Sequence, residues 1–408
     1  MNHLDIPQLL GLLVLILGFA KLFGFLAKQV GQPAVLGELV AGVVLGASAL
    51  GLVAPKNEVL HFLAELGVLI LLFEIGLEID LGKLLQSGGT STTVAVAGVV
   101  LPFAGGYAVC WSLGLDNLVS IVAGATLTAT SVGITARVLA DLGRLQDTES
   151  QIVLGAAVID DILGLIILAV VGGLTEGQAI TVLGVAKITG IAFGFLAATL
   201  VLGGLIVPTV VRWFSHVNLP GTQTTVAIML AFGLAWLASA AGSAMIIGAF
   251  AAGLLLRKTP QAKEMGKGIA SLGHFFVPIF FVVVGSAVDV RAFNPVDPAN
   301  RQTLLVGGLL VVVAVLGKFL AGYTPFWFRG NKTVIGVGMI PRGEVGLIFA
   351  QMGLSSGIFD SGLFSAVTLM VMITTFMAPP LLKLLFPPIP LGTEPPNRTG
   401  IQELVSEP

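Results

Sequence analysis

Two neighbouring acids, Asp160 and Asp161, lie in an apolar segment that reads GAAVIDDILGLIIL from residue 155 to residue 168. A carboxylate inside an apolar helix is costly in protein or in lipid, so such residues usually face a pathway or a partner. On a helix, neighbouring side chains point about 100° apart, so each acid reaches a different partner. We expect a fixed cation to hold one acid and a mobile ion to bind the other.

A lysine provides the candidate for the fixed cation. Lys318 lies inside the apolar run from Val315 to Leu320. A buried ammonium needs a counter-charge, and the acids at 160 and 161 are the obvious candidates. Because a desolvated lysine can lose its proton, an aspartate–lysine pair can open and close with proton uptake. The alternative is a lysine that snorkels to the membrane interface.

Two further segments combine polar groups with residues that interrupt helices. The first, TLTATSVG from Thr126 to Gly133, contains the hydroxyls of Thr130 and Ser131. The second, GMIPRGE, starts at Gly338 and contains a proline that removes a backbone donor, flanked by glycines. Hydroxyls and freed carbonyls are hard oxygen donors that suit a small alkali cation. Alternatively, the hydroxyls bond back to their own helix in a tightly packed bundle.

The second interrupted segment also carries two charges, Arg342 and Glu344. Both lie too deep in an apolar run to be ordinary surface charges. They would compensate helix dipoles where the helix breaks, or pair with neighbours. We expect a structural or gating role for them rather than direct binding of an ion.

Composition defines the class of protein that must position these groups. Of 408 residues, 56% are hydrophobic and only 10% are charged, and the mean hydropathy is +1.01. These values indicate an all-α polytopic membrane protein. A nucleic-acid partner is not expected, because the largest basic cluster runs only from Arg257 to Lys267. The single cysteine, Cys110, excludes an internal disulfide.

The chain contains thirteen apolar runs of roughly membrane-spanning length. They lie near residues 8–27, 33–53, 61–79, 92–113, 117–139, 150–173, 180–212, 222–240, 243–257, 269–288, 302–323, 333–353 and 361–386. Residues 1–387 would form the membrane domain, and residues 388–408 a polar cytoplasmic tail. No signal peptide is expected, because the N-terminus lacks a basic region.

Basic residues predict the orientation. With the N-terminus outside, the outer loops hold only Lys56, Arg291 and Arg301. The cytoplasmic loops hold Lys28, Lys83, Arg137, Arg144, Arg212, Arg257, Lys258, Lys263, Lys267, Arg329, Lys332, Lys383 and Arg398. This excess of inside charge also supports an odd number of spans and a cytoplasmic C-terminus.

Two sequence matches indicate an internal repeat. GELVAG at residues 37–42 resembles GAFAAG at 248–253, and the spacing from Gly76 to Asp80 matches that from Gly285 to Asp289. The shift is seven spans, an odd number, so residues 1–173 and 222–387 would be inverted copies joined by a linker at 180–212. The interrupted segments then fall at corresponding positions. Chance recurrence in a chain with 53 glycines is the alternative.

Four motifs in this order resemble the monovalent cation:proton antiporter superfamily, in particular its bacterial Nap-type sodium/proton antiporters and Kef-type potassium efflux proteins. They are AVIDD at 157–161, TATSVGIT at 128–135, GMIPRGEVGLI at 338–348 and Gly317-Lys318. The resemblance extends to about Pro387.

The resemblance implies a dimerisation domain and a core domain that moves like an elevator during alternating access. Asp161 matches the carrier of ion and proton, Asp160 matches the acid that pairs with the lysine at 318, and Thr130 and Ser131 match the broken span near the ion. Members with adjacent acids and this lysine are typically electrogenic. The implied protein is a homodimer in the bacterial cytoplasmic membrane that exchanges Na⁺, with Li⁺ or K⁺ as alternatives, for H⁺ and needs no cofactor.

The chain departs from Kef proteins at two points. They usually place Gln before the acid, where this chain has Asp160, and they carry a C-terminal nucleotide-binding domain. A K⁺/H⁺ antiporter of Kef type and a sodium-coupled solute symporter are the alternatives. A cation channel and an intramembrane aspartyl protease are less favoured, since the protease needs two acids from different helices that share a proton.

Overall fold

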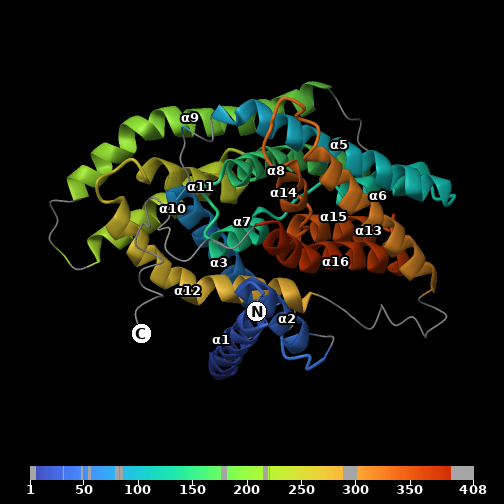
Figure 1. The fold of residues 1–408 in the computed structure, drawn as a ribbon, viewed down its shortest axis with the longest axis horizontal. Coiled ribbons are helices and arrows are strands. Elements are labelled where there is room, and N and C mark those ends of the chain that lie inside the picture. Colours follow the sequence, from blue (N-terminus) through green and yellow to red (C-terminus); the bar gives the residue numbers. More distant parts are fainter. Residues whose placement is uncertain are drawn as a thin grey trace.

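A computed structural model describes residues 6–30, 32–46, 49–53, 57–78, 82, 86–175, 182–214, 219, 221–287 and 301–386. Its regular elements are helices, which confirms the predicted all-α class (Figure 1). The helices are α1 (Ile6–Gln29), α2 (Ala34–Leu45), α3 (Glu58–Glu78), α5 (Gly88–Ser112), α6 (Asn117–Thr126), α7 (Val132–Asp141), α8 (Thr148–Thr175), α9 (Val182–Phe214), α10 (Thr222–Ala240), α11 (Met245–Leu256), α12 (Ala262–Ser286), α13 (Arg301–Ala321), α14 (Lys332–Gly338), α15 (Glu344–Ser355) and α16 (Ser361–Leu385).

Each predicted apolar run contains one helix or, at two positions, a pair of short helices. Among the described residues, nine helices are long and apolar enough to cross a membrane, and four more apolar helices are shorter. The second run is longer than its helix, because α2 ends at Leu45 and the chain then turns through Gly51 at φ +64°. Arg137, assigned above to a cytoplasmic loop, instead lies within α7.

Both predicted interruptions are present. Residues 127–131 separate α6 from α7, and residues 339–343 separate α14 from α15. Pro341 lies in the second gap, where its missing N–H and fixed φ prevent a continuous helix. The short helices α2 and α11 have 12 residues each and also occupy corresponding positions in the two halves of the chain.

The helices form two bundles. In the first bundle α1, α2, α3, α10, α11 and α12 pack on one another, and in the second α5, α6, α8, α13, α14, α15 and α16 do so. Helix α9 contacts α8, α10 and α11. Helix α7 packs on α8 and α16 of the second bundle and also on α2 and α3 of the first. Much of the second bundle lies to the right in Figure 1.

Close glycine contacts join the two halves of the chain crosswise. A Cβ on Gly42 of α2 would lie 2.8 Å from the Cα of Gly285 in α12. A Cβ on Gly253 of α11 would lie 2.8 Å from the Cα of Gly76 in α3. These four glycines belong to the two sequence matches. A glycine of one match in one half of the chain therefore contacts a glycine of the other match in the opposite half. Asp80 and Asp289 lie outside the described residues.

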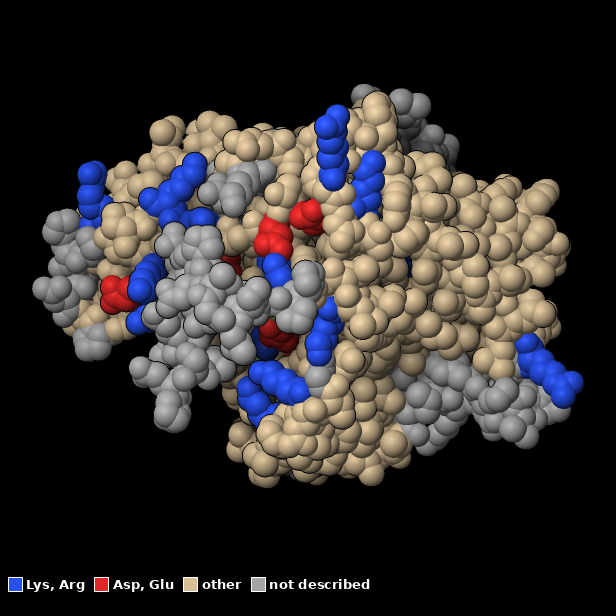
Figure 2. Space-filling view, in the orientation of Figure 1, with Lys and Arg blue, Asp and Glu red and all other residues tan. Residues whose placement is uncertain are grey.

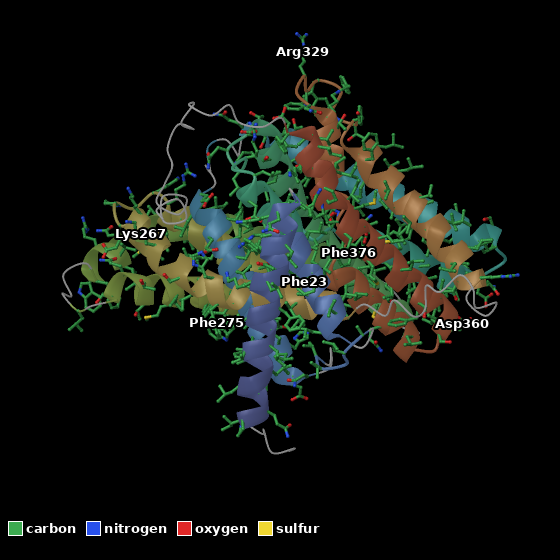
Figure 3. All side chains as sticks on the ribbon, turned by 60° about the horizontal axis from the view of Figure 1, so that its bottom comes forward. Phe23, Lys267, Phe275, Arg329, Asp360 and Phe376 are labelled. Atoms are coloured by element: carbon green, nitrogen blue, oxygen red, sulfur yellow. The ribbon has the colours of Figure 1, made fainter. Side chains whose placement is uncertain are left out.

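The outer faces of the helices are strongly apolar. Val14 of α1, Leu205 of α9 and Leu305 of α13 are exposed by more than half, as expected for side chains that face lipid. Figure 2 shows a broad face over the right of the molecule with almost no charge. Side chains such as Phe23 and Phe275 mark the first bundle in Figure 3, and Asp360 marks the start of α16 in the second.

Candidate functional site

The two interrupted segments cross and bond to each other inside the second bundle. The backbone N–H of Ser131 donates to the carbonyl of Pro341 at 2.8 Å. The hydroxyls of Thr130 and Thr135 donate to the carbonyls of Met339 at 3.5 Å and Gly338 at 2.7 Å. A Cβ on Gly343 would lie 2.7 Å from the Ser131 hydroxyl oxygen, so this close crossing requires a glycine.

Four helix ends meet at this crossing. α6 and α14 bring their C-termini, with carbonyls that lack helical partners, while α7 and α15 bring their N-termini. Helix ends carry partial charges, negative at the C-terminus and positive at the N-terminus. Backbone groups buried at membrane depth need partners within the protein, so this arrangement provides polar groups around one point of an otherwise apolar bundle.

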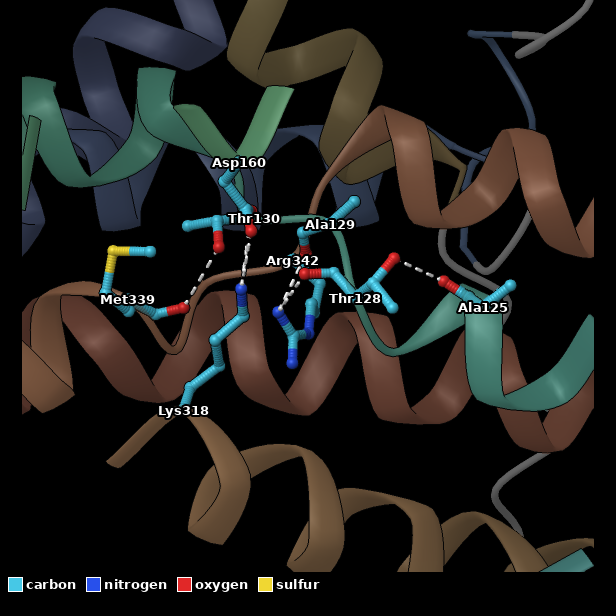
Figure 4. A network of polar contacts seen from close by, with 8 residues as sticks. All are labelled: Ala125, Thr128, Ala129, Thr130, Asp160, Lys318, Met339 and Arg342. Atoms are coloured by element: carbon cyan, nitrogen blue, oxygen red, sulfur yellow. Dashed lines mark hydrogen bonds and ion pairs between the residues drawn. The ribbon is translucent and has the colours of Figure 1, made fainter. Parts of the chain in front are cut away.

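Arg342 lies in the second gap and is fully buried. Its Nη1 donates to the carbonyls of Ala129 at 2.7 Å and Thr128 at 3.5 Å, just beyond the C-terminus of α6 (Figure 4). Its own carbonyl accepts a hydrogen bond from Thr375 of α16. The guanidinium therefore lies where the dipole of α6 is negative. Glu344 begins α15, and its side chain lies outside the described residues.

Asp160 of α8 and Lys318 of α13 form a buried ion pair. The Nζ of Lys318 lies 3.2 Å and 3.3 Å from the two carboxylate oxygens, and the side chains are 1% and 0% exposed (Figure 4). Gly98 makes room for the lysine side chain, and Gly317 allows α13 to approach Pro102 of α5. A Cβ on Gly98 of α5 would lie 3.2 Å from that Nζ, and one on Gly317 would lie 2.9 Å from Pro102.

The two adjacent acids have different environments. Asp160 is buried against Lys318, whereas Asp161 is partly exposed. The charges of Asp160, Asp161 and Arg342 all act on Lys318. Thr130 and Ser131 are buried at the crossing, and the Ser131 hydroxyl has no hydrogen-bond partner among the residues that the structure describes. A cation beside Asp161 would draw its other ligands from hydroxyl and carbonyl oxygens.

Several residues that shape this region did not stand out in the sequence. Thr135 lay within a recognised motif, but nothing in its type distinguished it from the other threonines. Gly98 is one of 53 glycines, and only its contact with Lys318 explains it. Thr375 lies in an ordinary apolar span, where a hydroxyl that bonds its own helix is the usual expectation.

The family described as "Sodium/hydrogen exchanger, transmembrane" matches residues 12–386. The chain belongs to this family. Several curated exchangers resemble it over nearly their whole length. The high-affinity Na⁺/H⁺ antiporter NhaS3 of Synechocystis is 42% identical over 409 residues, with 92% of this chain and 89% of the relative covered. The Na⁺/H⁺-K⁺ antiporter GerN of Bacillus cereus is 36% identical, with 92% and 95% covered.

The exchanger fold is also that of a solved structure. The sodium proton antiporter MjNhaP1 from Methanocaldococcus jannaschii superposes with a TM-score of 0.66 and covers 93% of this chain and 96% of its own. Its sequence identity is 16%, so the similarity concerns the fold alone. The predicted superfamily is thereby confirmed by both sequence and fold.

Proposed function

We propose that this exchanger is a secondary antiporter that moves Na⁺ in one direction and H⁺ in the other through a site at Asp161. The observation that carries the proposal is the buried Asp160–Lys318 pair, next in sequence to a more exposed acid and close to the crossing of two broken helices. The names of the relatives from Synechocystis and Bacillus cereus support Na⁺ and H⁺ as the exchanged ions.

Competition at one carboxylate would couple the two ions. Deprotonated Asp161 would bind a partly dehydrated cation, with oxygens from Thr130 and Ser131 as further ligands. Burial favours the protonated carboxylic acid, whereas a bound cation favours the carboxylate, so proton and cation exclude each other. The protonated site would return without the metal, and obligatory exchange follows from this exclusion alone.

The Asp160–Lys318 pair would supply a second proton per cycle. When the lysine releases its proton, the pair loses its attraction, and when the proton returns the pair reforms. Two protons moved against one monovalent cation would make the exchange electrogenic. Arg342 keeps its charge throughout and, together with Glu344, would hold the crossing in shape rather than bind the ion.

The bundles suggest how the site would reach both sides of the membrane. The first bundle would serve as the dimerisation domain and the second as a moving core, with residues 1–173 and 222–387 as inverted repeats and 180–212 as the linker. The active unit would be a homodimer in a bacterial cytoplasmic membrane, with the N-terminus outside and the C-terminus in the cytoplasm. No resident cofactor is proposed.

K⁺/H⁺ exchange is the second candidate, because K⁺ appears in the name of the Bacillus cereus relative. A carboxylate with hydroxyl and carbonyl oxygens accepts either ion, and the choice depends on cavity size and on how far the ligands can move. Na⁺-coupled solute uptake is less favoured, since it has no need of a lysine paired with one of two adjacent acids.

A single transport assay tests the proposal. Purified protein in liposomes with a trapped pH dye and an imposed proton gradient receives Na⁺, K⁺ or Li⁺ in turn. Cation-driven proton movement is expected in the unsubstituted protein and in Glu65→Gln, a half-exposed acid that pairs with His61 of its own helix, and is expected to vanish in Asp161→Asn. Proton movement that persists in Asp161→Asn would exclude the assigned site, and sodium uptake that requires an organic solute would favour a symporter.

A further inference from the structure

Helix α7 joins the crossing to the boundary between the bundles. It begins directly after Ser131 and packs on α2 and α3 of the first bundle. Arg137 lies six residues beyond Ser131, about 9 Å along a helix that rises 1.5 Å per residue. A displacement of the crossing relative to the first bundle would therefore carry Arg137 with it.

Two acids of the first bundle, Glu38 and Glu74, lie on the helices that pack on α7. Glu38 of α2 is only 4% exposed, and its Oε2 has no hydrogen-bond partner among the described residues. Glu74 of α3 lies against α12, where a Cβ on Gly273 would be 2.6 Å from its Oε1. Both helices that carry these glutamates pack on α7, and the charges of both glutamates act on Arg137 across this boundary.

Arg137 also has an acid on its own helix. Its Nε lies 3.2 Å from Oδ1 of Asp141, one turn further along α7. That pair moves as a unit with α7, whereas the attraction to Glu38 and Glu74 depends on where the second bundle stands relative to the first. The other charged groups near Glu38 are Lys21 and Lys28 of α1, and His274 of α12 lies near Lys21 and Arg137.

We infer that Arg137 is a positioning residue for transport. Its attraction to Glu38 and Glu74 stabilises the arrangement of the bundles described here against the alternative arrangement in the transport cycle. The physical reason is that a buried carboxylate without a partner is costly, and α7 carries the cation that lies across the boundary from Glu38. The inference rests on the proposed function, because it assumes that the bundles move relative to each other.

Asp141 provides the opposite case. It competes with Glu38 and Glu74 for the same guanidinium but does not cross the boundary. Removal of its charge leaves Arg137 free to interact more strongly with the first bundle. Neutralisation of Arg137 or of the two glutamates should therefore shift the population toward the alternative arrangement, whereas neutralisation of Asp141 should shift it the other way.

The test measures the distance between the bundles directly. Spin labels at Leu26→Cys on α1 and Leu384→Cys on α16, both exposed, are introduced into full-length Cys110→Ala protein in liposomes. Double electron–electron resonance gives the populations of the two arrangements. Arg137→Gln and the double variant Glu38→Gln/Glu74→Gln are each expected to change the population ratio about tenfold in the same direction. Their combination should add little, and Arg137→Lys should restore the ratio.

The transport assay separates two kinds of failure. If the unsubstituted protein exchanges no cation, the proposed function fails whatever the distances show. If it exchanges Na⁺ for H⁺ but Arg137→Gln leaves both the distance populations and the apparent KM for Na⁺ unchanged, the inference is overturned and the proposed function stands. Lower thermal stability in Arg137→Gln without a population shift would likewise overturn it, since that indicates a structural role alone.

Discussion

At the scale of single residues, Lys318 and Asp160 each compensate the buried charge of the other. Both side chains are essentially without solvent contact, so neither charge can turn to water when its partner is lost. Measurements on buried ion pairs in other proteins show that removal of one partner is far more damaging than replacement of both.

Lys318→Ala should therefore destabilise the protein by about 3–5 kcal/mol, because it leaves a buried carboxylate unpaired. Thermal unfolding of the detergent-solubilised protein measures the effect. The double variant Asp160→Asn/Lys318→Ala is the control and should recover a large part of the loss. A double variant that is no more stable than Lys318→Ala would show that packing of the lysine stem, and not its charge, matters there.

At the scale of elements, the crosswise glycine contacts set the separation between helices of the two halves. A Cβ on Gly42 would lie 2.2 Å from the carbonyl oxygen of Val282, and one on Gly253 would lie 2.2 Å from that of Phe73. Backbone atoms cannot rotate away as side chains do, so even a methyl group forces the helices apart.

Gly42→Ala and Gly253→Ala should each lower stability, by about 1–3 kcal/mol or more, and by similar amounts because the contacts are equivalent. Gly233→Ala on α10 is the matched control, since a Cβ there meets nothing within 4 Å. It should leave stability unchanged or slightly raise it, because Ala favours helices more than Gly. A thermal shift series on the three variants decides this, and equal effects in all three would contradict the assigned contacts.

The helices themselves followed closely from the sequence. Their apolar length indicated where the helices lie, and Pro341 and the hydroxyl-rich segment around Thr130 indicated both interruptions, since these depend on local composition. The end of α2 at Leu45 was missed, because the residues that follow remain apolar enough to extend the run although the backbone turns at Gly51. Hydropathy records how apolar a segment is, not whether it is helical.

Contacts between distant residues were less accessible from the sequence. The proximity of Asp160 to Lys318 was expected, because a buried ammonium allows few partners. The contacts of Arg342 with Ala129 and Thr128 were not, since any free carbonyl satisfies a guanidinium and the sequence does not say which one is near. Arg137 was assigned to a loop because a charge at the end of an apolar run looks interfacial, whereas the structure places it on a helix between two bundles.

At the scale of the whole molecule, we expect transport to involve relative movement at the boundary between the two bundles. Leu39 of α2 and Phe376 of α16 line one small cavity at this boundary, together with Gly343 of the second gap. If the second bundle moves relative to the first during exchange, these residues must change their separation.

A covalent link across the boundary should therefore stop exchange. Leu39→Cys and Phe376→Cys are joined by a bifunctional thiol reagent in Cys110→Ala protein, and Na⁺-driven proton movement in liposomes is measured before and after the link is cleaved. Phe19→Cys and Ile279→Cys, which pack in one cluster within the first bundle, provide the control link and should leave exchange intact. Full activity with the boundary link in place would rule out relative movement at this point.

The crosswise glycine pairs also determine when the molecule can complete its fold during synthesis. Gly42 leaves the ribosome long before its partner Gly285, and at about 5–20 residues per second the wait is roughly 10–50 seconds. During that interval α2 has been synthesised, but α12, on which it packs, has not. The first half of the chain must therefore wait in the membrane or be shielded by the insertion machinery, and a ribosome that stalls between the two glycines leaves a half-exchanger with its closest packing surface uncovered.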